Sequence, residues 1–256
     1  MILRRVMAHF RKQEWTAIAI DFVIVVIGVF IGLQVQEWSK QRDDRRREAQ
    51  IIADMLGDLE IDRAQFANGM SADMRGLSAA NAAFAGAGLS PVAFDWSARG
   101  TTGIDYTFDL SKVSEYPAAP RDMLWTDVVI RSFPTPSTST YDAMVGAGDI
   151  KLIGDRAIVR AIQDYRNRSD SVIAQNGKLM SIREKSMETG AEYGLAPFQS
   201  RPAEDVYRLF ATEPALAASV RILTAFSIFH YGELKDADAH AAALQERLRT
   251  YLESVK

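Results

Sequence analysis

The residues best suited to binding a metal lie near the C-terminus. His230, Glu233, Asp236 and His240 recur at spacings of three or four residues, which would place them on one face of a helix. A helix rises about 1.5 Å per residue, so the two histidines would lie about 15 Å apart along its axis. The ligands of a single zinc ion lie about 2 Å from the metal, which this separation does not allow. We therefore expect no metal site here and interpret Asp236 and His240 as a pair on the helix surface.

The sequence also lacks the motifs of common enzymes. It contains no Walker phosphate-binding loop, no H-E-x-x-H zinc motif, no G-x-S-x-G nucleophile turn and no dinucleotide-binding fingerprint. Gly146 and Gly148 lack the third glycine that such a fingerprint needs. Glu184, Glu188 and Glu192 recur every four residues, which indicates a polar stripe on a helix rather than a catalytic pair. Cysteine is absent, which excludes cysteine nucleophiles and disulfides. We expect no catalytic residue, no cofactor and no bound metal.

The organising element is instead an apolar stretch near the N-terminus. Residues 16–35 contain one formal charge, Asp21, and otherwise consist almost entirely of apolar residues and glycine. About 20 such residues in a helix span the roughly 30 Å core of a bilayer. Trp15 and Trp38 bracket the stretch, and tryptophan prefers the two membrane interfaces. We predict a single transmembrane helix at residues 15–37, with the lipid bilayer as its partner.

Two other interpretations of this stretch are a cleaved signal peptide and a buried helix of a soluble protein. A signal peptide ends in small residues at an A-x-A-like site, whereas this stretch runs into LQVQEWSKQRDDRRR. A buried helix is seldom apolar on every face and then abruptly charged. The sequence therefore favours an uncleaved anchor.

Three residues within the anchor could mediate contact with another membrane helix. Gly28 and Gly32 lie four residues apart, which lets a second backbone approach closely. Asp21 precedes Gly28 by seven residues and therefore lies near the same face. A carboxyl group there could face a partner helix, or its side chain could reach the nearby interface. We predict that the anchor associates as a homo-oligomer or with the helix of a partner membrane protein.

The charges that flank the anchor bear on orientation and on partners. Residues 1–14 form a basic tail with four Lys or Arg, and five more follow the anchor by Arg47. The two counts nearly tie, but a short basic tail before a first apolar helix is usually cytoplasmic. This arrangement favours a domain on the far side of the membrane. The whole chain has a formal net charge of −3, so we expect no nucleic-acid partner.

Residues 38–85 should continue the anchor as a helical stalk, because they contain no proline. Seam positions alternate spacings of three and four, as in a coiled coil. The arginines in this seam argue against a dry two-stranded coiled coil, and an intramolecular helical bundle would show the same pattern. The seam positions are Val35, Trp38, Arg42, Arg45, Ala49, Ile52, Leu56, Leu59, Arg63, Phe66 and Met70.

Residues 86–136 contain recurrent glycine and proline and should form an irregular insertion. Two alternating runs, Val92–Trp96 and Ile104–Leu110, could pair as a small hairpin, and residues 121–133 could form a short helix. Ordered insertions of this kind often carry binding surfaces.

Residues 137–256 should complete the bundle. Ser139 or Thr140 can cap a short helix, and Asp155 can cap the next one. We expect a turn at residues 190–202, then helices at about 203–210 and 215–256.

Two segments carry a family resemblance. The anchor from Val25 to Trp38 fits VVIG-x-x-I-x-LQ-x-x-x-W, and Tyr141 to Ile153 fits Y-x-x-[LM]-x-x-x-G-x-[IL]-x-L-I. The longer segments that contain these motifs, residues 19–38 and 140–167, resemble a family of uncharacterised bacterial membrane proteins and cover about a fifth of the chain. The resemblance implies an N-terminal anchor in the bacterial inner membrane and a mostly helical domain. It brings no assigned activity.

The sequence thus predicts a mostly α protein in which a transmembrane helix continues into a helical bundle. The missing catalytic motifs, the anchor and the glycine spacing favour a non-enzymatic interaction protein, such as a scaffold, an assembly factor or an accessory subunit. The alternative is a sensor-like bundle that binds a small ligand, with the 86–136 insertion as a lid.

Overall fold

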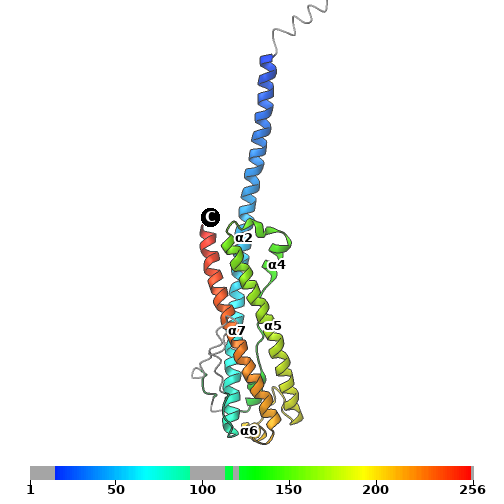
Figure 1. Ribbon diagram of the computed structural model, residues 1–256, viewed down its shortest axis with the longest axis vertical. Helices are drawn as coiled ribbons and strands as arrows, with labels where there is room; N and C mark the ends of the chain where they lie inside the picture. The colour runs from blue at the N-terminus through cyan, green and yellow to red at the C-terminus, as the bar shows by residue number, and fades with distance from the viewer. Residues whose placement is uncertain (1–14, 93–112, 118–120, 255–256) are drawn as a thin grey trace, which may run out of the picture. The chain divides into compact units, whose positions relative to one another are not determined.

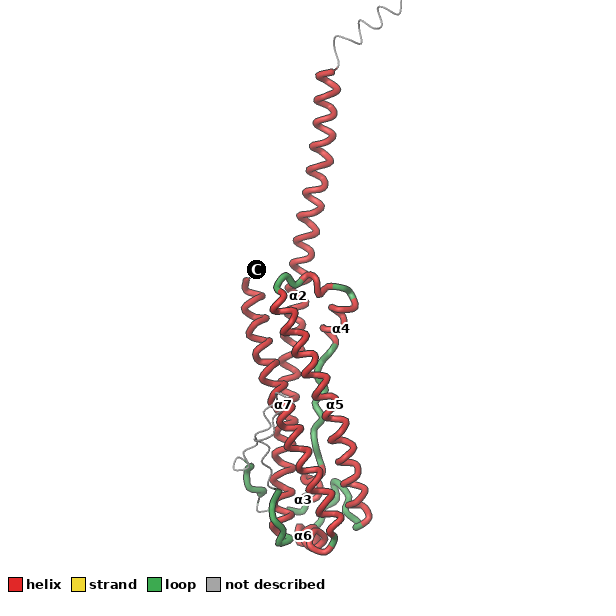
Figure 2. Tube along the Cα trace, viewed as in Figure 1, coloured by secondary structure: helices red, strands yellow, loops and turns green. Residues whose placement is uncertain are grey.

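The structure is a computed structural model that describes residues 15–92, 113–117 and 121–254. Every regular element in these ranges is helical, which confirms the mostly α fold (Figure 1 and Figure 2). The elements are α2 (Trp15–Gly86), α3 (Leu124–Val129), α4 (Ser139–Gly146), the 3-10 helix η2 (Asp149–Leu152), α5 (Arg156–Glu192), α6 (Ala203–Thr212) and α7 (Pro214–Ser254).

Helix α2 is continuous over 72 residues, as the absence of proline predicts. The chain nevertheless divides into two compact units, residues 1–50 and residues 51–256, so α2 contributes to both.

In the first unit, the large apolar side chains of α2 from Phe22 to Val35 are between 48% and 68% exposed. Two helices of the described chain are long and apolar enough to cross a membrane: α2 from Phe22 onward, and α7. Half of the most apolar window of α7 is buried inside the second unit, as in the core helix of a soluble bundle. None of the corresponding window of α2 is buried.

In the second unit, α5 and α7 run alongside the last 36 residues of α2 (Figure 1). Their apolar faces form two core clusters. One contains Ile52, Leu59 and Phe66 of α2 together with residues of α5 and α7. The other joins the end of α2 to α3, α6 and the adjoining ends of α5 and α7. Within this unit, other helices of the same chain thus cover the buried face of α2. This arrangement is the intramolecular helical bundle rather than a two-stranded coiled coil.

The seam on α2 differs from the predicted one on both sides of Leu59. Before it, Met55 is buried and Leu56 is only partly buried, and the same shift of one residue recurs after it. Asp62 and Gly69 are buried there, whereas Arg63 and Met70 are only partly buried. Asp62 can be buried because its Oδ2 accepts a 2.6 Å hydrogen bond from the Tyr165 hydroxyl. Arg63 instead reaches the bundle surface, where its Nε lies 2.7 Å from Asp238 Oδ1. A seam drawn from hydropathy alone does not distinguish these neighbours.

The helix boundaries mostly follow the local signals. The Asp155 carboxylate accepts a 2.7 Å hydrogen bond from the Ala157 N–H, which confirms the predicted cap of α5. The short helix within residues 121–133 is limited to α3, and α4 begins after Thr138, whose side chain makes no cap bond. The predicted hairpin lies outside the described residues except for Val92.

Candidate functional site

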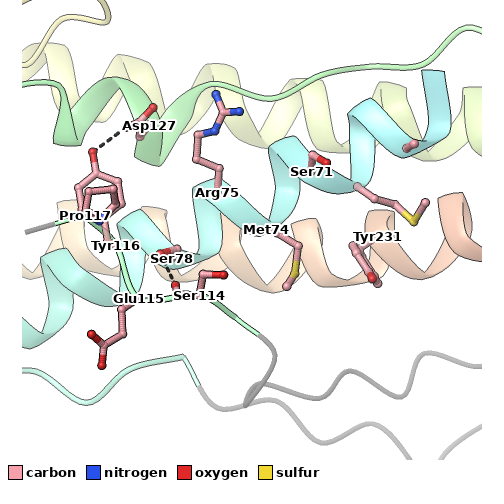
Figure 3. Close-up of a pocket in the computed structure, with 12 residues that line it drawn as sticks. Ser71, Met74, Arg75, Ser78, Ser114, Glu115, Tyr116, Pro117, Asp127 and Tyr231 are labelled. Atoms are coloured by element: carbon pink, nitrogen blue, oxygen red, sulfur yellow. Dashed lines mark hydrogen bonds between the residues drawn. The ribbon is translucent and has the colours of Figure 1, made fainter. Parts of the chain in front are cut away.

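A cleft of about 610 Å³ lies on the second unit (Figure 3). Its volume falls within the roughly 300–1,000 Å³ that is usual for small-molecule sites. Helix α2 supplies one side, α7 contributes Tyr231, α3 contributes Asp127, and the segment 114–117 contributes the rest. The cleft therefore forms where the insertion meets the bundle.

The α2 side of the cleft follows from helical periodicity. Met70, Ser71, Met74 and Arg75 recur at spacings of three or four and share one side of the helix. One turn further on, the Ser78 hydroxyl donates a 2.6 Å hydrogen bond to the Ser114 carbonyl. This bond fixes residues 113–117 against α2.

The opposite wall is held by a bonded pair of side chains. The buried Tyr116 hydroxyl donates a 2.6 Å hydrogen bond to Asp127 Oδ2. Burial, followed by the bond to Asp127, raises the pKa of the Tyr116 phenol above its usual value, so the hydroxyl remains a donor at neutral pH. Arg121 lies over the Tyr116 ring at 6.0 Å and donates to the Tyr207 hydroxyl at 2.9 Å. The wall is thus fixed without any ligand.

Charged and apolar side chains both line the cleft, and Arg75 and Glu115 point away from each other (Figure 3). Arg75 and Glu115 are exposed, and neither bonds to another described residue. Met70, Met74 and Tyr231 supply apolar surface beside them. This combination suits a small molecule with an apolar body and charged groups, because the guanidinium and carboxylate can each pair with an opposite charge.

A second polar cluster lies inside the bundle. His230 Nδ1 is 2.7 Å from Asp73 Oδ2, and His230 Nε2 is 2.8 Å from Asn176 Oδ1. Asn176 Nδ2 donates to the Pro134 carbonyl at 2.6 Å, which orients the amide. The Asn176 oxygen therefore accepts from His230 Nε2, which carries a hydrogen.

Arg131 completes this buried polar cluster. Its Nε lies 3.7 Å from Asp73 Oδ1 and donates to Ser227 Oγ at 2.8 Å. Its Nη1 donates to two carbonyls of its own segment. Burial lowers the pKa of Arg131 to about 10, whereas the nearby Asp73 carboxylate acts to raise the pKa of Arg131. Burial also raises the pKa of Asp73. The cluster residues Asp73, Arg131, Asn176 and His230 do not line the cleft, so we assign them a structural role.

Sequence reasoning placed His230 on a face with His240 and did not find its partners. His230 is buried, whereas His240 lies at the surface with Nδ1 3.5 Å from Asp236 Oδ2, as predicted for that pair. Among the described residues, no group of three or more His, Cys, Asp or Glu could hold a metal ion. Asp73 lies 157 residues from His230, so no local pattern could indicate the contact.

The predicted anchor residues lie in the first unit. A Cβ atom added at Gly28 or Gly32 would meet no other atom within 4 Å, so this face of α2 is open. Trp38 is 65% exposed. The side chains of Trp15 and Asp21 lie outside the described residues.

Comparison with known proteins found no matching family model, no matching curated protein and no matching solved structure. Each candidate site is therefore inferred from the chemistry of its own residues.

Proposed function

We propose that this chain is a membrane-anchored, non-enzymatic interaction protein that acts as a scaffold, an assembly factor or an accessory subunit of a membrane complex. The carrying observation is the apolar surface of α2, where residues from Phe22 to Val35 are exposed on every side of the helix. Such a surface is unfavourable in water and favourable in lipid.

The proposed location is the bacterial inner membrane, with one crossing and the second unit in the periplasm. The support is the basic N-terminal tail and the resemblance of the anchor to a bacterial membrane family. Carbonate extraction should leave the full-length chain in the membrane pellet. A mature N-terminus beyond residue 25 would contradict an uncleaved anchor.

Gly28 and Gly32 provide the first proposed contact. Their open face allows a second helix to approach, and close packing is a main source of attraction between helices in lipid. Replacing both by isoleucine should weaken self-association of residues 12–40 in a genetic reporter of membrane-helix dimerisation. Val25→Ile, an exposed control in the same helix, should have little effect. A wild-type signal no higher than a monomeric standard would reject homodimerisation through this face.

The cleft favours a second candidate function, a sensor-like module that binds a small ligand. Arg75, which bonds to no other described residue, suits a ligand with a carboxylate and an apolar body, such as an apolar amino acid. A ligand at 100 times its dissociation constant stabilises the folded state by about 2.7 kcal/mol. Thermal unfolding with a panel of amino acids tests this directly. Stabilisation should disappear in Arg75→Ala and persist in Arg249→Ala, which removes an exposed arginine outside the cleft.

A further inference from the structure

A second apolar groove lies at the end of the bundle where α5 stops. It has a volume of about 370 Å³ and lies between the last turns of α5 and the loop that follows. Its floor is apolar and its rim is acidic. The floor is formed by Met187, Ala191, Leu195 and Pro197, and the rim by Glu184 and Glu188. We call this site the tip groove.

The acidic residues of the rim are unfavourable for the helix in two respects. Glu184 and Glu188 lie four residues apart, where like charges repel each other across one turn. The stripe continues to Glu192, the last residue of α5, although negative charge is unfavourable at a helix C-terminus. Glu184 and Glu188 are exposed, and neither bonds to another described residue.

Phe198 directly follows Pro197, which lines the groove, and has an unusual conformation. Its φ is 61°, the left-handed region that bulky side chains rarely adopt. Its side chain is 74% exposed, which exceeds the 68% of Phe22 on the apolar anchor. Hydrogen bonds at Phe198 and at Arg201 hold the loop in this conformation. The Phe198 N–H donates to Thr126 Oγ1 at 2.8 Å, and the Arg201 N–H donates to the Asp122 carbonyl at 2.8 Å.

Backbone conformations and charge arrangements that are locally unfavourable, but that the rest of the fold maintains, are typical of binding sites. Here an apolar groove and two carboxylates that bond to no other described residue occur next to the exposed Phe198, which follows Pro197 of the groove. We propose that the tip groove binds an amphipathic basic helix of a partner protein. Its apolar face covers the groove floor, Phe198 packs against its edge, and Lys or Arg residues spaced by four pair with Glu184 and Glu188. The proposal rests on the proposed interaction function and names the chemistry of the partner.

Photo-crosslinking of the full chain in its native membrane tests the proposal. A benzophenone amino acid at Ala196, which lines the groove, should form an adduct whose crosslinked peptide is apolar on one face and carries Lys or Arg four residues apart. The same probe at Ile222, which is 53% exposed on α7, serves as the control and should form no such adduct.

Charge reversal then tests the rim. Glu184→Lys with Glu188→Lys should lower the adduct yield at least tenfold, and changing the two partner cations to Glu should restore it. Glu246→Lys with Glu253→Lys, an exposed pair outside the groove, should leave the yield unchanged. Phe198→Ala should also lower it. Circular dichroism of each variant confirms that the helices are intact.

Two results would overturn the tip groove. One is the absence of an adduct at Ala196 when the tagged chain still co-purifies with a partner, which leaves the interaction function standing. The other is an adduct that tolerates the Glu184 and Glu188 reversals. Failure of the interaction function itself has a different signature, a chain that neither self-associates nor co-purifies with any membrane protein.

Discussion

Two glycines of α5 should respond in opposite directions to the same substitution. A Cβ atom at Gly190 would lie 2.2 Å from Trp125 Cζ2 and 2.8 Å from Cη2. A Cβ atom at Gly177 would meet nothing within 4 Å. The pair therefore separates the effect of packing from the effect of helix propensity within one helix.

The expected magnitudes follow from these distances. Carbon atoms pack at about 3.5–4.0 Å, so the Trp125 ring and α5 would have to move apart by more than about 1 Å. Trp125 is only 2% exposed, and overpacking of a core costs about 1–3 kcal/mol. Replacing glycine by alanine in a helix contributes up to about 1 kcal/mol of stabilisation. We expect Gly190→Ala to lower the free energy of unfolding by about 1–2 kcal/mol and Gly177→Ala to raise it by about 0.5–1 kcal/mol.

Urea denaturation of the purified full chain in detergent, followed by circular dichroism, measures both values. Unchanged m-values would show that only stability differs. A Gly190→Ala variant as stable as Gly177→Ala would refute the close packing of Trp125 on α5. Because Gly190 is adjacent to Ala191, which lines the tip groove, the result also bears on how that groove is positioned.

Three further changes have defined outcomes. Ile52→Pro should cost at least about 3 kcal/mol and open α2 to limited proteolysis near residue 52, because proline removes a helical hydrogen bond; an uncut, equally stable variant would contradict a continuous helix. Tyr116→Phe should cost about 1–3 kcal/mol in urea denaturation, since it removes the bond to Asp127; no loss would mean that this bond does not hold the cleft wall. Burial raises the pKa of Asp73 above 3.8, so the folded chain holds this proton more tightly than the unfolded chain does. The free energy of unfolding should therefore decrease as pH rises above 3.8 through the folded-state pKa. Asp73→Asn should flatten this part of the profile, and an unchanged slope would reject the assignment.

The sequence predicted the features that local chemistry controls. The continuity of α2 depends on the absence of proline, and the start of α5 depends on the Asp155 carboxylate, which accepts from the N–H two residues further on. The turn after α5 contains Gly194, whose φ of 72° favours glycine. Each of these signals acts within a few residues and can be read without knowing the rest of the fold.

The candidate sites could not be predicted in the same way. The cleft requires Tyr116 to meet Asp127 and Ser78 to meet Ser114, all across an insertion with little periodicity. The tip groove was visible only as a stripe of glutamates, because its apolar floor forms when the loop after α5 folds back. The members of the buried polar cluster are polar, so hydropathy alone predicts them at the surface. Their partners lie far away in the chain, so no local pattern indicates that they are buried together.

Buried polar bonds help to determine the register of the bundle, and the register positions the cleft. Apolar positions that repeat every three and four residues look alike after a shift of seven, so hydrophobic burial alone discriminates weakly among such alignments. Asp62 with Tyr165, and Asp73 with His230, fix α2 against α5 and α7 at two levels. A shift along the helix axes would break both pairs and leave two carboxyl groups buried without partners. Each unsatisfied group costs about 1–3 kcal/mol or more, so the shifted alignment is disfavoured where apolar packing would tolerate it. The observed alignment brings Tyr231 of α7 to the side of α2 that carries Met70 and Met74, and the three residues line the cleft together.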